Sequence, residues 1–178
     1  MMKKHGASTV GLALLAAAAT AWRFIPIVRQ MVEAGDFPAH TAFARDMAVR
    51  HTLPVPHFLY HLLLIGMHAM TGLTWDGAAA SVTVAGLMVT AVLIARWVRE
   101  AVPGSIALQI GLAVALPLAL LTVQPALPFG QLARDQWLIG YWPANQWHNP
   151  TTLLSKPLAL ALFPLGLAAA CDRSGSSV

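Results

Sequence analysis

The residues with the clearest chemical potential lie in the segment 35–40, which reads G-D-F-P-A-H. Pro38 favours the first turn of a helix, so Asp36 is expected close to the N-cap of a helix that ends before Pro54. His40 follows Asp36 by four residues, a spacing that can bring both side chains to one helical face. The pair could then share a proton or a metal ion, with the carboxylate acting as a general base. The simpler alternative is that Asp36 only caps the helix.

Two arginines on the same expected helix could bind an anion. Arg45 and Arg50 both follow Asp36 on this helix, and Asp46 lies beside Arg45. A guanidinium group matches two phosphate oxygens at once, so the two arginines could clamp a phosphate. A solvated helix face without a ligand is the alternative interpretation.

Three histidines mark one side of the apolar segment 55–73. His57, His61 and His68 are separated by four and seven residues, so they share one face of a helix whose other side is leucine, isoleucine and methionine. This pattern is typical of a helix lying in a membrane interface, or of a span that faces a polar cavity. Two histidines at this spacing can also bind zinc, but no third ligand has a clear spacing, so an interfacial helix is favoured.

A second polar cluster lies just before the last apolar segment. It contains His148, Asn149 and Lys156, together with neighbouring amides and threonines. A cation at the edge of an apolar segment suits an anionic lipid head group. The alternative is an interfacial loop in which Lys156 only extends its ammonium group toward water.

The composition excludes an ordinary soluble enzyme. Of the 178 residues, 57% are hydrophobic and only 10% are charged, whereas soluble domains carry about 25% charged residues. The same apolar content excludes disorder, and the lone Cys171 excludes an internal disulfide framework. The net charge is +4, but the sequence has no basic stripe, so nucleic acid is not an expected partner. An integral membrane protein is the expected class, with the lipid bilayer as its first partner.

Hydrophobic runs predict an all-α integral membrane fold in a single membrane domain, 1–178. A spanning helix needs about 20 mostly apolar residues. About four segments meet this requirement, and amphipathic juxtamembrane helices are expected between the first two. The predicted spans are 6–24, 77–97, 105–123 and 153–170, with outer loops at 25–76 and 124–152.

The distribution of basic residues predicts the orientation. If 55–73 does not cross the bilayer and the N-terminus is cytoplasmic, the inner side carries Lys3, Lys4, Arg96, Arg99 and Arg173, as the positive-inside rule requires. If 55–73 crosses, the three arginines move outside, so the non-crossing arrangement is favoured. The first segment fits an uncleaved signal-anchor better than a cleaved signal peptide, because the downstream chain is also membrane-like. The expected location is a bacterial inner membrane.

These features together resemble the N-terminal part of GT-C-type membrane glycosyltransferases. This group includes the oligosaccharyltransferase catalytic subunit, protein mannosyltransferases and lipid A aminoarabinose transferases. The resemblance rests on a basic N-terminus with one span, an acidic start to a long first outer loop, and a small-residue-rich second span that ends in basic residues. The corresponding segments here are G-D-F-P-A-H at 35–40, R-D-M-A at 45–48, P-V-P-H-F-L-Y-H at 54–61, and 77–99.

The resemblance implies roles for individual residues. Asp36 matches the catalytic carboxylate, which acts on the acceptor directly or through a divalent metal such as Mg²⁺ or Mn²⁺, although the sequence names no certain cofactor. His40 is similar to the histidine of the D-x-x-x-H form of this motif. The donor would be a polyprenyl-phosphate-linked sugar, whose phosphate Arg45, Arg50 or Lys156 would bind. The other expected substrate-binding residues are His57, His148 and Asn149.

Two departures from the family keep a second interpretation open. Family members have many more spans than the four expected here, which suggests a truncated fragment or a small relative. Their second acidic motif has only Asp135 as a counterpart. The alternative function is a non-catalytic membrane subunit or assembly factor, since helices rich in small residues suit packing against a larger membrane protein.

Overall fold

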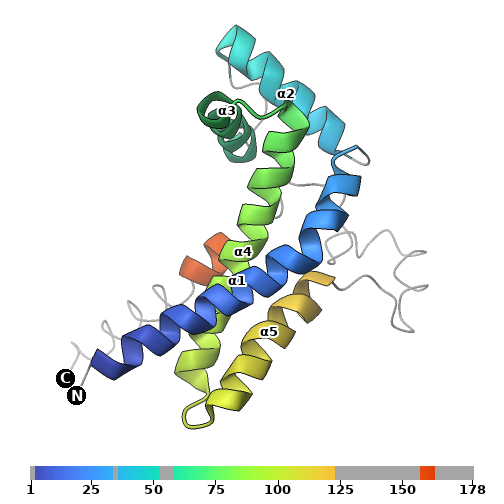
Figure 1. Cartoon of the computed structure of the whole chain (residues 1–178). Coiled ribbons are helices and arrows are strands. Elements are labelled where there is room, and N and C mark those ends of the chain that lie inside the picture. The colour runs from blue at the N-terminus through green and yellow to red at the C-terminus, as the bar shows by residue number, and fades with distance from the viewer. Residues whose placement is uncertain (1–2, 34–35, 53–57, 123–156, 163–178) are drawn as a thin grey trace, which may run out of the picture.

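A computed structural model of the chain describes residues 3–33, 36–52, 58–122 and 157–162 (Figure 1). These residues form helices joined by short connections, and none of them is in a strand. The all-α prediction is therefore confirmed for the part described. The long helices are α1 (Lys3–Met31), α2 (Phe37–Arg50), α3 (Leu59–Thr71), α4 (Trp75–Ala101) and α5 (Ile106–Thr122), and residues 157–162 form a sixth, short helix.

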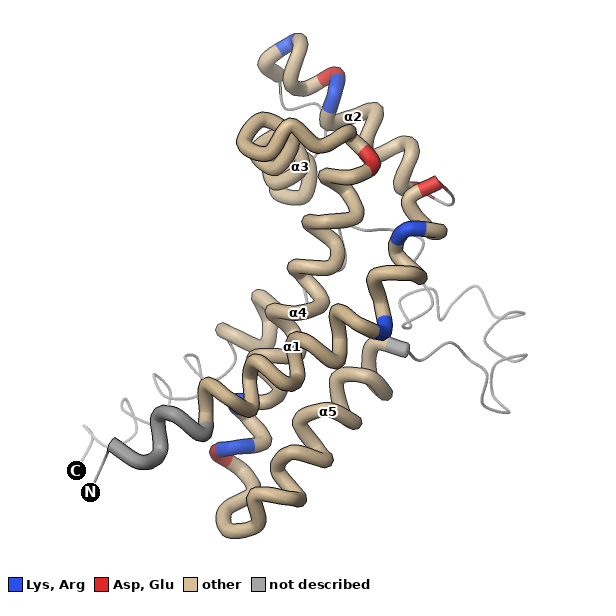
Figure 2. Tube along the Cα trace, in the orientation of Figure 1, with Lys and Arg blue, Asp and Glu red and all other residues tan. Residues whose placement is uncertain are grey.

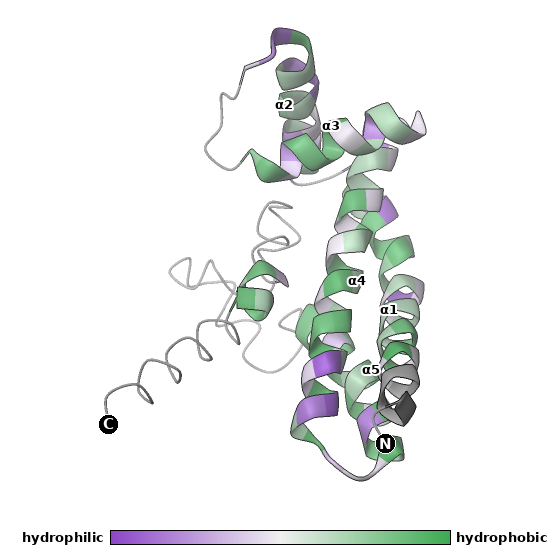
Figure 3. Cartoon of the chain, turned by 90° about the vertical axis from the view of Figure 1, so that its left-hand side faces the viewer, coloured by the Kyte–Doolittle hydropathy of each residue, from purple (hydrophilic) through white to green (hydrophobic). Residues whose placement is uncertain are grey.

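Helices α1, α4 and α5 pack side by side as a three-helix bundle (Figures 1 and 3). The beginning of α1 and the α4–α5 turn lie at the same end of this bundle in both views, so α4 runs against α1 and α5. Near this end the core is built mainly from alanines. Small side chains let the helix backbones approach closely. The buried residues here are Leu12, Ala16, Ala91, Ala95 and Ala113.

Helices α2 and α3 form a second layer at the opposite end of the bundle. Helix α3 is viewed end-on in Figure 1 and from the side in Figure 3, so it lies across α4. One hydrophobic cluster joins this layer to the bundle. It contains Phe24 and Val28 of α1, Val32 just after α1, Phe37 and Ala44 of α2, Tyr60 and Leu64 of α3, Ala79, Val82 and Leu87 of α4, and Leu121 of α5.

Local signals define where the helices of this layer begin and end. Asp36 precedes α2 at the N-cap position and Pro38 lies in the first turn, as predicted, although the Asp36 side chain makes no capping hydrogen bond. His51 follows the last residue of α2 and Gly72 follows the last residue of α3, and both have a positive φ. A left-handed residue at this position commonly terminates a helix. Thr74 then caps α4, because its Oγ1 accepts a hydrogen bond from the Gly77 amide at 3.1 Å.

Among the described helices, two are long and apolar enough to cross a membrane. They are Thr9–Met31, with 23 residues and a mean hydropathy of 1.7, and Trp75–Ala101, with 27 residues and a mean hydropathy of 2.2. The first contains most of the predicted span 6–24 but continues through Pro26 to Met31, so part of the expected outer loop is helical. The second contains the whole predicted span 77–97.

The other two predicted spans match the observed helices only in part. Helix α5 matches the segment 105–123 but is shorter, with 17 residues. Of the segment 153–170, only the helical residues 157–162 are described, and the loop 124–152 lies outside the described residues. Helix α3 has 13 residues, which is about 20 Å of helix, whereas a bilayer core is about 30 Å thick. Residues 53–57 lie outside the described residues, so the expectation that 55–73 does not cross stays a prediction.

Charge is confined to particular parts of the described chain (Figure 2). Charged residues lie on α2, at both ends of α4, on the part of α1 nearest α2 and at the start of α1 (Lys3 and Lys4), while α5 and the centre of α4 carry none. The hydropathy colouring gives the same picture, since the bundle is mostly hydrophobic between its ends (Figure 3). The α2–α3 layer carries four of these charges, Asp36, Arg45, Asp46 and Arg50.

Candidate functional site

Most of the sequence-predicted site residues that the structure describes come from α2 and its N-cap. The Asp36 side chain is exposed beside the first turn, and its backbone carbonyl accepts a hydrogen bond from the His40 amide at 3.0 Å. His40 itself is only 5% exposed. One side chain of the expected Asp36–His40 pair therefore faces solvent, while the other is enclosed by protein.

His40 is instead brought together with His61 of α3. The distance from His40 Nδ1 to His61 Nε2 is 2.9 Å, which is a direct hydrogen bond between two buried imidazoles. One ring must donate through its N–H and the other must accept through its lone pair. The aromatic ring of Phe43 makes an edge contact with each imidazole, and Tyr60 does the same. This pair is the main polar contact between α2 and α3 in the described residues.

Tyr60 connects the same cluster to α4. Its hydroxyl lies 3.4 Å from Thr83 Oγ1, and both side chains are buried. Burial raises the pKa of the Tyr60 phenol well above its ordinary value, so this group stays protonated at physiological pH. Sequence reasoning overlooked Tyr60 and Thr83, because their contacts join residues more than twenty positions apart, a separation that no local spacing reveals.

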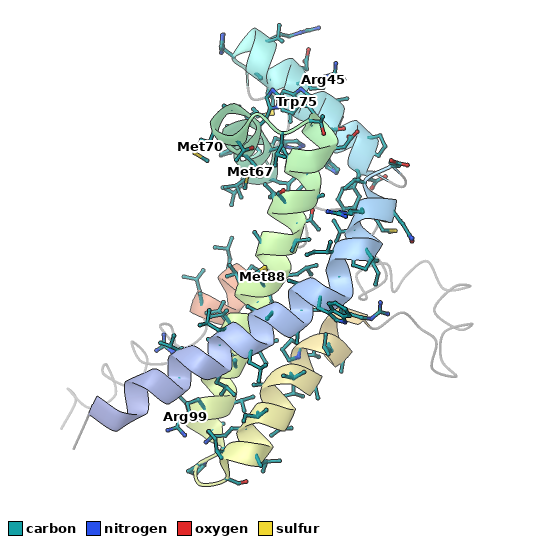
Figure 4. The ribbon with its side chains drawn as sticks, in the orientation of Figure 1. Arg45, Met67, Met70, Trp75, Met88 and Arg99 are labelled. Atoms are coloured by element: carbon teal, nitrogen blue, oxygen red, sulfur yellow. The ribbon has the colours of Figure 1, made fainter. Side chains whose placement is uncertain are left out.

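The two arginines of α2 lie in different surroundings. Arg50 Nε forms an ion pair with Asp46 Oδ1 at 2.7 Å on the solvent side of the helix. Arg45 is exposed and makes no ion pair with any described residue (Figure 4). Of the two candidates for phosphate binding, Arg45 therefore has its guanidinium group available, whereas Arg50 is already paired with a carboxylate.

The predicted histidine face of the segment 55–73 is divided in the structure. His61 is fully buried against α2. His68 lies at the other end of α3, stacked on Trp75 with ring centroids 4.2 Å apart, and its Nδ1 is 2.6 Å from the Leu73 carbonyl oxygen. The two rings thus serve separate packing contacts and do not form one polar surface. His57 lies outside the described residues.

The solvent side of α3 is apolar. Met67 and Met70 extend from the side of α3 that is turned away from α2 (Figure 4). A soluble protein seldom leaves so many large apolar side chains of one short helix exposed. The exposed apolar residues at and along this helix are Phe58, Leu59, Leu62, Leu63 and Met70.

The candidate site contains no preformed metal centre among the residues described. No three His, Cys, Asp or Glu side chains in the described ranges lie close enough together to hold a metal ion. His148, Asn149, Lys156 and Asp135 all fall outside those ranges. The described part of the site therefore consists of an exposed carboxylate, an exposed guanidinium group and an apolar helix face, behind which the histidine pair is buried.

The opposite end of the bundle has its own buried polar contact. Arg99 Nη1 donates to Gln109 Oε1 at 2.9 Å, and Gln109 Nε2 donates to the Val102 carbonyl at 2.6 Å. Gln109 is fully buried. These bonds join α4, the turn and α5, which explains the single strongly polar residue of an otherwise apolar segment as a structural clamp.

Comparisons of the chain with models of protein families, with curated proteins and with solved structures found no match.

Proposed function

We propose that the chain is a membrane glycosyltransferase-like module that transfers a sugar from a polyprenyl-phosphate donor at the outer face of a bilayer. The observation that carries the proposal is the position of Asp36. Its carboxylate is exposed at the first turn of α2, at the end of the bundle away from the N-terminus, in the same layer as the apolar face of α3. A lipid-linked sugar needs both a polar site and an apolar surface, and the α2–α3 layer carries one of each.

The membrane placement is supported by the lengths and charges of the helices. Helix α4 carries Trp75 and Asp76 at its start and Arg96, Arg99 and Glu100 at its end, with no charge between. Its 27 residues make a helix of about 40 Å, which exceeds the bilayer core of about 30 Å. The basic end and the N-terminus lie together, so both would be cytoplasmic. In this proposal α1, α4, α5 and 153–170 are the four spans.

Helix α3 then lies in the outer interface. Its exposed leucines would face acyl chains, while its buried side packs on α2 and α4. An amphipathic helix in the interface plane commonly buries its apolar face at the boundary between head groups and chains. The isoprenoid chain of the donor would lie along this helix, and the sugar phosphate would lie beside α2.

The chemistry assigned to the site is displacement at the anomeric carbon. The acceptor hydroxyl forms the new bond to this carbon, the bond to the phosphate oxygen breaks, and polyprenyl phosphate leaves with the bonding electrons. Asp36 takes the proton of the hydroxyl as general base. A basic side chain stabilises the negative charge that develops on the leaving phosphate, and the candidates for this role are Arg45, Arg50 and Lys156. His40 is buried, so it positions α2 rather than contacting the substrate.

The proposal predicts that Asp36→Asn abolishes transfer. The amide cannot take a proton, and loss of a general base typically lowers a rate by about 100-fold or more. Membranes that contain the full chain are supplied with a radiolabelled polyprenyl-phosphate hexose, and the label released from the lipid fraction is counted.

The matched control is Asp46→Asn, which changes another carboxylate on α2 that is paired with Arg50 on the solvent side. It is expected to keep wild-type transfer. Full activity of the Asp36→Asn variant, at normal membrane insertion, would contradict the proposal.

A non-catalytic membrane subunit is the second candidate. It is favoured by the exposed apolar side of α5, which includes Ile106, Leu108, Ile110, Leu116 and Leu120. This surface could contact a larger membrane protein instead of lipid. Purification of the full chain in mild detergent distinguishes the two functions, because a subunit would retain a stoichiometric partner and would bind no polyprenyl phosphate by itself.

A further inference from the structure

The hydrogen bond between His40 and His61 joins two titratable groups in a buried position. The imidazole nitrogens are 2.9 Å apart and the ring centroids are 5.1 Å apart. His40 is 5% exposed and His61 is fully buried. Imidazole is the side chain whose ordinary pKa, about 6.5, places its change of charge within the physiological pH range. The contact therefore differs from the inter-helix hydrogen bonds Tyr60–Thr83 and Arg99–Gln109, because both of its groups are imidazoles.

The number of protons on the pair decides whether the bond can exist. With both rings neutral, one N–H donates to the lone pair of the other ring. With one proton added, the charged ring still donates to the neutral ring. With two protons added, each facing nitrogen carries a hydrogen, so neither can accept. Two like charges then stand in contact in a buried site, which is strongly unfavourable.

The surroundings of the pair are mostly apolar or neutral in the described residues. On α2, Phe43 contacts both rings, and Asp36, Arg45 and Asp46 lie toward solvent. On α3, the neutral Tyr60 contacts both rings, and its hydroxyl reaches Thr83 of α4. The charged residue of α4 that is nearest to Thr83 in sequence is Asp76, which is exposed. At the end of α1 and in the turn after it, Val28 and Val32 join the cluster, while Arg29 and Glu33 are exposed.

We propose that the His40–His61 pair is a proton-operated latch that holds α2 on α3 when the pair is neutral or carries one added proton, and releases α2 when both imidazoles are positively charged. Release separates the α2–α3 layer but leaves the α4–α5 turn intact, because that turn is held by Arg99 and Gln109. The inference stands on the geometry of α2 and α3 and does not depend on the proposed sugar transfer. It does give Asp36, at the start of α2, a position that changes with the pH of its compartment.

The test is hydrogen exchange of the full chain in lipid nanodiscs at about pH 7.5 and about pH 5, on either side of the ordinary imidazole pKa. Exchange rates are corrected for the intrinsic effect of pH. The expected result is that α2 peptides lose about tenfold or more of their protection at the lower pH, while α4 and α5 peptides do not change. Unchanged protection of α2 in the wild-type chain overturns the proposal.

Variants of the pair identify the groups responsible. Asn places its amide near the position of Nδ1 and Gln places its amide near that of Nε2, so His40→Asn with His61→Gln keeps a donor and an acceptor without a titration. This double variant is expected to hold α2 equally at both pH values. Each single variant leaves one imidazole. When this imidazole is protonated, it can still donate its hydrogen bond to the amide oxygen of the new side chain, so each single variant should also lose the acid response.

His51→Asn is the matched control. His51 is exposed at the end of α2 with a φ of 54°, a conformation that Asn tolerates well. This variant is expected to keep the full acid response of the wild type. The proposal is overturned if His51→Asn removes that response. It is also overturned if either single variant, His40→Asn or His61→Gln, still releases α2 at the lower pH.

Discussion

The two ends of the helical bundle are closed by buried polar contacts of different kinds. At the α4–α5 turn, Gln109 bonds to the Arg99 guanidinium and to the Val102 carbonyl, and all three residues lie within ten positions of one another. At the α2–α3 end, His40 bonds to His61 across 21 positions. A guanidinium group is protonated at all physiological pH values, whereas an imidazole is not.

The difference shows that buried polar groups can be satisfied by hydrogen bonds that persist at every physiological pH or by hydrogen bonds that depend on pH. Buried polar groups need hydrogen-bond partners at both ends. The turn satisfies them with groups whose charge does not change, so this end should be equally stable over the physiological pH range. The α2–α3 layer satisfies them with a pair that tolerates only one added proton. We therefore expect the end that carries the candidate site to respond to its surroundings, while the other end does not.

The largest predicted effect is that of Leu64→Ala on the α2–α3 end. Leu64 is fully buried in the cluster that joins this layer to the bundle. Truncating a buried leucine leaves a cavity and lowers the free energy of unfolding by about 2–5 kcal/mol. Thermal unfolding of the full chain in detergent measures the loss, and hydrogen exchange should locate it in α2 and α3. Leu63→Ala, at a residue that is 43% exposed, is the control, and an equal loss in both variants would contradict the assigned layer.

The next effect is that of Gln109→Leu on the opposite end. The substitution keeps the side-chain volume but removes both hydrogen bonds, leaving the Arg99 guanidinium and the Val102 carbonyl without the amide. We expect a loss of about 2–3 kcal/mol in the free energy of unfolding, of the same size at about pH 5 and about pH 7.5 because no group of the clamp titrates there. Arg96→Ala removes an exposed arginine paired with Glu100 and should have little effect. A pH-dependent loss in Gln109→Leu would remove the distinction between the two ends.

The smallest effect is that of Arg50→Ala. Its ion pair with Asp46 lies on the surface of α2, with side chains that are 70% and 42% exposed. Such pairs contribute about 0.5 kcal/mol or less, and salt screens them. The stability of the variant, measured by thermal unfolding at low and high salt, should stay close to the wild type at both. A loss above about 1 kcal/mol would mean that surface charge, rather than the histidine pair, holds α2 in place.

Much of the architecture was predictable from local patterns in the chain. The charge-free run from Gly77 to Ala95 predicts α4, and Pro38 with Asp36 correctly predicts the start of α2. The end of α1 was harder to predict, because the helix continues past Arg23 and Pro26 to Met31. Polar residues and a proline reduce helical preference but do not end a helix whose other side chains, such as Val28, are buried in the core.

The candidate site was predictable only in part. The proline at position 38 marked the start of a helix, and this correctly indicated that Asp36 lies beside the first turn of α2. The spacing of Asp36 and His40 suggested a shared role, but it could not show that His40 turns inward to a partner on another helix. The histidines of 55–73 share one face by periodicity, yet His61 meets α2 while His68 stacks on Trp75. Periodicity describes one helix and carries no information on what packs against each part of it.

The sequence by itself determined the all-α character of the described residues and the approximate positions of α4 and α5, because composition and hydrophobic periodicity depend on neighbouring residues along one chain segment. The tertiary structure alone decided which polar groups meet. It brought His40 to His61 and Tyr60 to Thr83, and it left Asp36 and Arg45 exposed. These outcomes depend on how α3 lies across α4 and how α2 packs on both, since hydrogen bonds act over about 3 Å and that distance is set by the packing of whole helices.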